Sequence, residues 1–235
     1  MYILSLFSPA DWMALGLTLG LWIAIGWRIE HPSRGKPSVT VLMKGYRRAW
    51  MEAFVTRQPR IFDAQIMGLL RQGTAFFAST SLLAVGATLA LIGNGMQISG
   101  VTDVIPGVIN AELAPIRLIL VVFFLTSAFL KFVWSNRLFG YCAVVMAAVP
   151  NEPDLPITYP RAAQAAEINI RAALNFNRGL RAMYFALAAL AWVLGPIPLV
   201  LGALIVCVLL WQREFASLSQ EILTAPKTTT QERAP

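Results

Sequence analysis

The sequence predicts an all-α, polytopic helical membrane protein with about four transmembrane helices, several of which extend into the cytoplasm as a short helical bundle. Hydrophobic residues make up 57% of the 235 residues and charged residues only 13%, and the mean hydropathy is +0.63, which lies outside the usage of soluble domains. The apolar residues fall into blocks near the roughly 20 residues that cross about 30 Å of hydrocarbon. A single helical membrane domain over residues 1–223 accommodates these blocks.

The first predicted span covers about residues 11–27. We expect Asp11 to act as its N-cap and Trp12, Trp22 and Trp27 to anchor it at the membrane interfaces. Basic residues follow this block and do not precede it, whereas a cleaved signal peptide carries them before its apolar core. We therefore expect a retained first helix.

The second and third spans are predicted at about 74–92 and 115–134. A helix that begins after Pro59 can run unbroken into the second span, and the third span can continue helically to about residue 148. A similar overhang precedes the fourth span from about Arg161. Apolar faces on these overhangs predict a short cytoplasmic bundle, through Ile61, Ile66, Leu69 and Leu70, then Leu138, Tyr141, Cys142 and Val145, then Ala165, Ile168, Ala172 and Phe176.

The fourth apolar run, at about 183–211, is broken at 195–198. Gly195, Pro196 and Pro198 cannot all sit in a straight helix without loss of backbone hydrogen bonds. We expect one kinked span, and a re-entrant or tightly paired hairpin remains the alternative. The side of the C-terminal tail depends on this choice, because a hairpin returns the tail to the cytoplasm.

The orientation follows from the basic residues. The segment 28–71 carries nine Lys or Arg residues, whereas the segment 93–114 carries none. We therefore expect the loops 28–73 and 149–182 in the cytoplasm and the N-terminus in the periplasm of a bacterial inner (cell) membrane. The tail at 224–235 has no apolar periodicity and is predicted to be disordered.

An amphipathic helix is predicted at 41–57 within the basic loop. Its apolar face consists of Met43, Tyr46, Trp50 and Phe54. We expect it to lie on the inner leaflet as a membrane-surface helix, or on the protein's own cytoplasmic helices. The net charge of +7 then indicates anionic lipid as a partner and gives no reason to expect nucleic acid.

Polar residues gather near the cytoplasmic ends of three predicted spans. Ionisable groups there are costly unless they are paired, hydrated or reach the interface. They could converge on an anionic ligand or lipid headgroup, with Asp63 neutralising part of the positive charge, or reach separately to lipid phosphate. The candidate residues are Asp63, Arg71, Lys131, Asn136, Arg137, Asn175, Arg178 and Arg181.

No motif for catalysis, phosphate binding or metal binding is found. Cys142 and Cys207 lie apart in apolar segments, and His31 is the single histidine. We therefore expect neither an enzyme nor a cofactor nor a metal site.

Four segments together resemble an uncharacterised bacterial membrane-protein family, domain-of-unknown-function family 599. They are Arg48-Ala-Trp50-Met51, Arg60-Ile-Phe-Asp63 with Phe76-Phe77-Ala78-Ser79, Lys131-Phe-Val-Trp134-Ser-Asn136-Arg137, and Asn177-Arg178-Gly179-Leu180-Arg181-Ala-Met-Tyr184-Phe185-Ala186. The resemblance covers about residues 48–215 and implies a polytopic membrane fold without an assigned activity.

Two functions fit these observations. The first is a non-catalytic accessory or scaffold membrane protein, whose cytoplasmic helices recruit a protein partner or a second copy of the chain. The alternative is a small transporter or anionic lipid- or ligand-binding protein that uses the cationic residues. The sequence shows no internal repeat and no buried acidic residue in the spans, and both observations count against transport.

Overall fold

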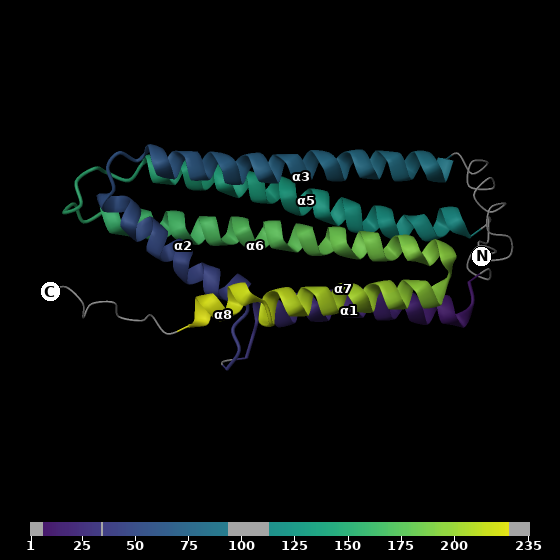
Figure 1. Cartoon of the computed structure of the whole chain (residues 1–235). Helices are drawn as coiled ribbons and strands as arrows, with labels where there is room; N and C mark the ends of the chain where they lie inside the picture. Colours follow the sequence, from purple (N-terminus) through teal and green to yellow (C-terminus); the bar gives the residue numbers. More distant parts are fainter. Residues whose placement is uncertain (1–6, 34, 94–112, 226–235) are drawn as a thin grey trace.

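The computed structural model describes residues 7–33, 35–93 and 113–225, and these form long helices that run side by side (Figure 1). Their bounds are α1 Pro9–Glu30, α2 Val39–Thr56, α3 Ile61–Gly93, α5 Ala114–Ala147, α6 Thr158–Leu190, α7 Pro196–Phe215 and α8 Leu218–Thr224. Four helical segments in the described part are long and apolar enough to cross a membrane: Pro9–Glu30, Ile61–Gly93, Ala114–Ala147 and Pro196–Thr224. The predicted all-α class with about four such helices is confirmed.

Helix α1 begins earlier than the sequence predicts, and Asp11 is not its N-cap. The Oγ atom of Ser8 accepts from the backbone N–H of Asp11, and the Asp11 carboxylate accepts from the backbone N–H of Ser8 in return. This capping box satisfies two donors that a helix start leaves open. Pro9 follows at the first helical position, where its missing N–H has no consequence.

The chain reverses at Gly195, so the prediction of one kinked fourth span is wrong and the hairpin alternative holds. Helix α6 ends at Leu190, a short 3-10 turn spans Ala191–Leu194, and α7 runs back beside α6 (Figure 1). Gly195 has a φ of 130°, which only glycine adopts without strain. Pro196 is then the first residue of α7 and Pro198 the third, where helical N–H groups have no intrahelical acceptor. The two prolines therefore start a helix and do not kink one.

The hairpin packs tightly because small residues face each other. A Cβ atom on Gly202 of α7 would lie 3.3 Å from the carbonyl oxygen of Ala188 on α6. Leu199 and Ala203 of α7 are fully buried in a core that also contains Phe124 of α5 and Phe185 of α6. Helix α6 thus lies at the level of the spans, although only its C-terminal half is apolar.

Helices α3, α5 and α6 extend past the ends of α1 and α7, as the overhang lengths predict (Figure 1). Cys142, Ala165 and Ala172 are buried in the core of this extension, as expected, with Phe139 and Met146. Ile61, Leu69 and Tyr141 were expected on the same apolar faces, but they are exposed. The extension is therefore a packed bundle whose buried faces differ in part from those predicted.

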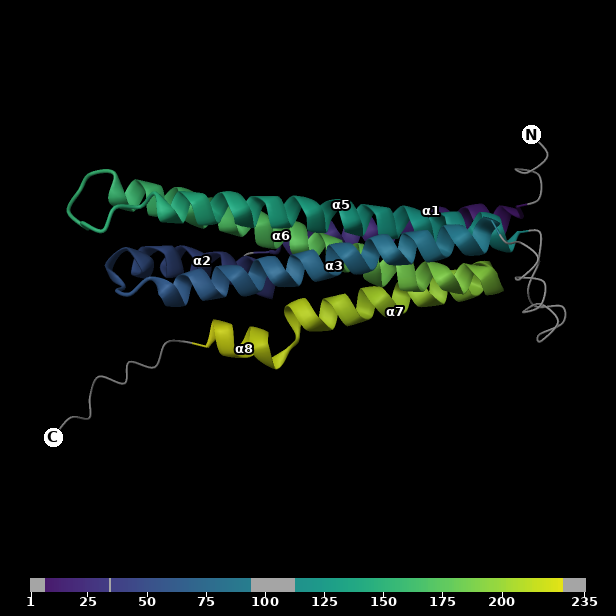
Figure 2. The ribbon, with the colours of Figure 1, turned by 90° about the horizontal axis from the view of Figure 1, so that it is seen from above.

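Helix α2 lies on the protein's own helices, which is one of the two positions the sequence left open. It packs against α6 and buries Met51, Phe54 and Val55 in the extension core. Met43 and Tyr46 of the predicted apolar face are 37% and 49% exposed. The short helix α8 turns away from the axis of α7 (Figure 2). Of the predicted disordered tail, 226–235 lies outside the described residues.

Candidate functional site

A pocket of about 460 Å³ opens between α1, α5 and α6, at the end of α1 that leads into α2. Its charged lining residues are Glu30 of α1, Lys131 of α5, and Arg178 and Arg181 of α6. The remaining lining residues are Trp22, Ile23, Gly26, Trp27, His31, Ser127, Leu130 and Ala182. Three of the predicted site residues therefore do meet, and they meet around a carboxylate that was not predicted.

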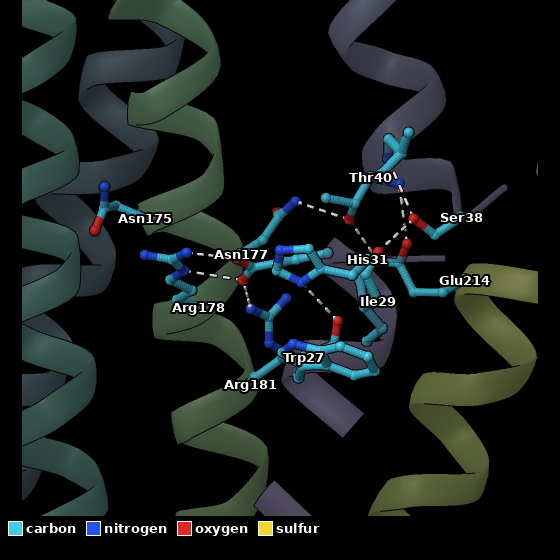
Figure 3. A network of polar contacts seen from close by, with 12 residues as sticks. Trp27, Ile29, His31, Ser38, Thr40, Asn175, Asn177, Arg178, Arg181 and Glu214 are labelled. Carbon is cyan, nitrogen blue, oxygen red and sulfur yellow. Dashed lines mark hydrogen bonds and ion pairs between the residues drawn. The ribbon is translucent and has the colours of Figure 1, made fainter. Parts of the chain in front are cut away.

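Glu30 accepts hydrogen bonds from both arginines of α6. The Nε atom of Arg178 lies 2.9 Å from Oε1 of Glu30, Nη2 of Arg178 bonds Oε2, and Nη2 of Arg181 bonds Oε1. The Glu30 side chain is 12% exposed and that of Arg181 only 6%. Arg178 and Arg181 are three residues apart on α6 and point toward the end of α1 (Figure 3). These ion pairs hold two guanidinium groups in fixed positions at the pocket wall.

The pocket retains an excess of positive charge. Three cationic side chains face one carboxylate, and Lys131 forms no ion pair with any described residue. Trp27 and Leu130 at the rim are 62% and 59% exposed. The pocket thus combines positive charge inside with exposed apolar side chains at its rim. This arrangement is complementary to an anionic headgroup attached to a hydrocarbon chain.

The structure does not bring the other five predicted residues to this pocket. Asp63 lies near the start of α3, where its Oδ1 atom accepts from Trp50 at 2.6 Å and from Arg57. It therefore neutralises Arg57 and not the predicted cluster, which explains why the buried carboxylate is tolerated. Arg71 lines a different cavity in the extension.

Asn136, Arg137 and Asn175 also lie away from the pocket. Arg137 is exposed and donates to the hydroxyl of Tyr141, one turn along α5. The amide of Asn175 donates to the backbone carbonyl of Arg171 at 2.9 Å, within α6. Figure 3 shows Asn175 apart from the network around Arg178.

A second polar network beside the pocket fixes the start of α2. The backbone N–H and the hydroxyl of Thr40 each donate to the Glu214 carboxylate at 2.9 Å, and the amide of Asn177 donates to the Thr40 hydroxyl at 3.3 Å (Figure 3). The Ser38 hydroxyl donates to the Ile29 carbonyl at 2.7 Å. Asn177 precedes Arg178 in α6, so adjacent residues of one helix contribute to this network and to the pocket.

Sequence reasoning missed a buried ion pair at the opposite end of α1. The Nη2 atom of Arg117 lies 3.0 Å from Oδ1 of Asp11, and the indole N–H of Trp192 donates to the same oxygen at 2.9 Å. The expectation that no acid is buried in the spans is therefore wrong. The order Ser8-Pro9-Ala10-Asp11 indicates a capping box at the start of α1, but no local pattern indicates the pair with Arg117, 106 residues away in the chain.

The fold thus defines a multi-pass helical membrane protein with a cationic pocket at one end of its apolar helices. Among the described residues, no three His, Cys, Asp or Glu side chains gather as metal ligands would. The family model described as "Protein of unknown function, DUF599" matches residues 13–219, so the chain belongs to this family. Neither the curated proteins nor the solved structures provide a match.

Proposed function

We propose that this protein is a non-catalytic membrane protein that binds an anionic lipid headgroup in the pocket between α1, α5 and α6. The observation that carries the proposal is the position of Lys131, a cation without an ion-pair partner among the described residues, beside the paired Arg178 and Arg181. The exposed rings and aliphatic side chains at the rim leave a path for acyl chains along the outside of the bundle. Binding accounts for these features, and nothing in the pocket favours transport.

The proposed orientation places this pocket at the cytoplasmic surface of a bacterial inner membrane. Of the nine basic residues of 28–71, Arg28 lies in the last turn of α1 and the other eight follow this end of the helix, at which the pocket lies. Helix α8 lies at this end too, since the amide of Gln220 donates to the carbonyl of Pro37 at 3.4 Å. With the hairpin, the C-terminal tail is then cytoplasmic, and the N-terminus is periplasmic.

Native mass spectrometry of the protein released from its own membrane tests the proposal. We expect the wild type to retain an anionic phospholipid. The Lys131→Gln variant should retain at least about tenfold less bound lipid, because a charge-assisted hydrogen bond is removed. Arg137→Gln is the matched control, since this cation lies on the same helix outside the pocket. Equal lipid retention by Lys131→Gln and Arg137→Gln would refute the proposal.

A second candidate function is the accessory or scaffold role, and the surface of the extension favours it. Ile61, Phe62 and Leu69 of α3 are each more than half exposed in the part that projects past α1 and α7 (Figure 1). Affinity purification in mild detergent should then recover a stoichiometric protein that Phe62→Glu loses. Leu218→Glu, at an exposed apolar position of α8, should retain it. Recovery with both variants, or with neither, argues against this surface as the interface.

A further inference from the structure

A second cavity lies in the extension, away from the pocket described above. It has a volume of about 660 Å³, within the roughly 300–1,000 Å³ range of small-molecule sites. It lies between the first turns of α3 and the last turns of α5, and most of its lining is apolar and includes Phe54, Met67, Gly68 and Met146. Arg60, Arg71 and Asn151 complete the lining, which contains no carboxylate.

Arg60 is a fixed cation at one side of this cavity. Its Nη1 atom donates to the Val149 carbonyl at 2.8 Å, and its Nη2 atom donates to the carbonyls of Pro150 at 2.8 Å and Val55 at 3.2 Å. Its guanidinium lies 4.5 Å from the centre of the Phe54 ring. The buried Nε atom has no hydrogen-bond partner within the described residues. Neutral carbonyls and a ring hold the group in place but leave its charge uncompensated.

Arg71 supplies a second cation at the rim. It is exposed, it lies eleven residues after Arg60 in the chain, and the described residues give neither arginine an ion pair. Met67 and Gly68 lie between the two arginines along the chain. The cavity therefore has a hydrophobic floor with uncompensated positive charge at its edge, and its complement is a small anion with an apolar body.

We propose that this cavity binds a soluble, single-chain aliphatic carboxylate, with the carboxylate at Arg71, in the positive field of Arg60, and the alkyl chain against Met67 and Met146. This site shares no residue with the lipid pocket and does not depend on it. It lies in the extension, past the ends of α1 and α7 (Figure 1), so that a ligand can enter from water.

A photoreactive octanoate that carries a diazirine on its chain tests the proposal. The full chain is placed in nanodiscs of zwitterionic phosphatidylcholine, and the crosslinked peptides are mapped by mass spectrometry. We expect label at 60–71 and 143–151 that excess octanoate removes, and at least about fivefold less label with the uncharged octanamide analogue, because the charge-assisted contact is lost.

Gly68→Leu is the decisive variant. A Cβ atom at Gly68 meets nothing within 4 Å, so a side chain can start there without a clash, and we expect leucine to take up part of the cavity. We expect it to reduce labelling about tenfold, and Arg71→Gln to do the same, whereas Gly45→Leu, which also has open space at its Cβ position, and Lys131→Gln retain wild-type labelling. Label outside the two segments, or unchanged label in Gly68→Leu, would overturn the proposal.

Discussion

The Nη2 atom of Arg117 lies 3.0 Å from the Oδ1 atom of Asp11, and both side chains are almost fully buried between α1 and α5. Trp192 donates to the same carboxylate oxygen, so the pair also ties the hairpin turn to α1. Removing one member of a buried pair leaves the other charge without compensation. Asp11→Asn should therefore destabilise the protein by about 3–5 kcal/mol.

Thermal unfolding in nanodiscs measures this effect. Asp154→Asn is the control, because Asp154 is exposed in the loop between α5 and α6. The double variant Asp11→Asn, Arg117→Met should recover part of the lost stability, since it leaves no buried charge unpaired. If Asp11→Asn and Asp154→Asn melt alike, the pair makes no net contribution.

Gly179 marks a close approach of α6 to α5. A Cβ atom there would lie 2.6 Å from Cε1 of Phe132, whose ring is fully buried. Gly179→Ala should lower the free energy of unfolding by about 1–3 kcal/mol through overpacking. Gly140→Ala should instead stabilise α5 slightly, because its Cβ atom meets nothing within 4 Å and alanine favours the helix. Denaturation curves that move the same way for both variants would contradict this packing.

The hairpin at Gly195 predicts which residues share a side of the membrane. In a chain without Cys142 and Cys207, Lys36→Cys and Ser219→Cys should react alike with a membrane-impermeant maleimide, and Leu194→Cys should react from the opposite side. All three positions are exposed. A single kinked span would place residues 36 and 219 on opposite sides, so opposite labelling would contradict the hairpin.

Glu214 is predicted to hold the start of α2 in place. Glu214→Ala removes both acceptors of Thr40, and hydrogen bonds to charged groups contribute about 1.5–3 kcal/mol each. The backbone amide of Thr40 should then exchange with deuterium at least about tenfold faster. Glu221→Ala, at an exposed position of α8, is the control and should leave the exchange unchanged.

Most of the helical architecture could be predicted from the sequence, because span length and the period of apolar residues depend on local chain properties. The hairpin could not, since Gly195, Pro196 and Pro198 are compatible with either a kink or a reversal. The decisive facts are the positive φ of Gly195 and the packing of Gly202 against Ala188, which are tertiary. Arg178 and Arg181 also interrupt the apolar pattern of α6. For this reason the sequence did not show that the C-terminal half of α6 is a helix separate from α7.

The candidate site was predicted only in part for a related reason. Lys131 lies on α5 at the same level as Arg178 and Arg181 on α6. The predicted bounds of the spans were enough to indicate that these residues lie near the same end. The partner carboxylate is Glu30, 148 residues from Arg178 in the chain, and only the packing of α1 beside α6 reveals it. Asp63 looked equivalent in sequence, but α3 carries it to the far part of the extension.

Filling the lipid pocket is the most direct test of the proposed function. Gly26 lines the pocket, and a Cβ atom there would make ordinary contact with Arg181 at 3.7 Å. Gly20 lies on the same helix with nothing within 4 Å and serves as the control. Melting temperatures are compared in nanodiscs of phosphatidylcholine with and without phosphatidylglycerol. Phosphatidylglycerol should raise the melting temperature of the wild type and Gly20→Leu but not of Gly26→Leu; an equal rise in all three would contradict anionic lipid binding in this pocket.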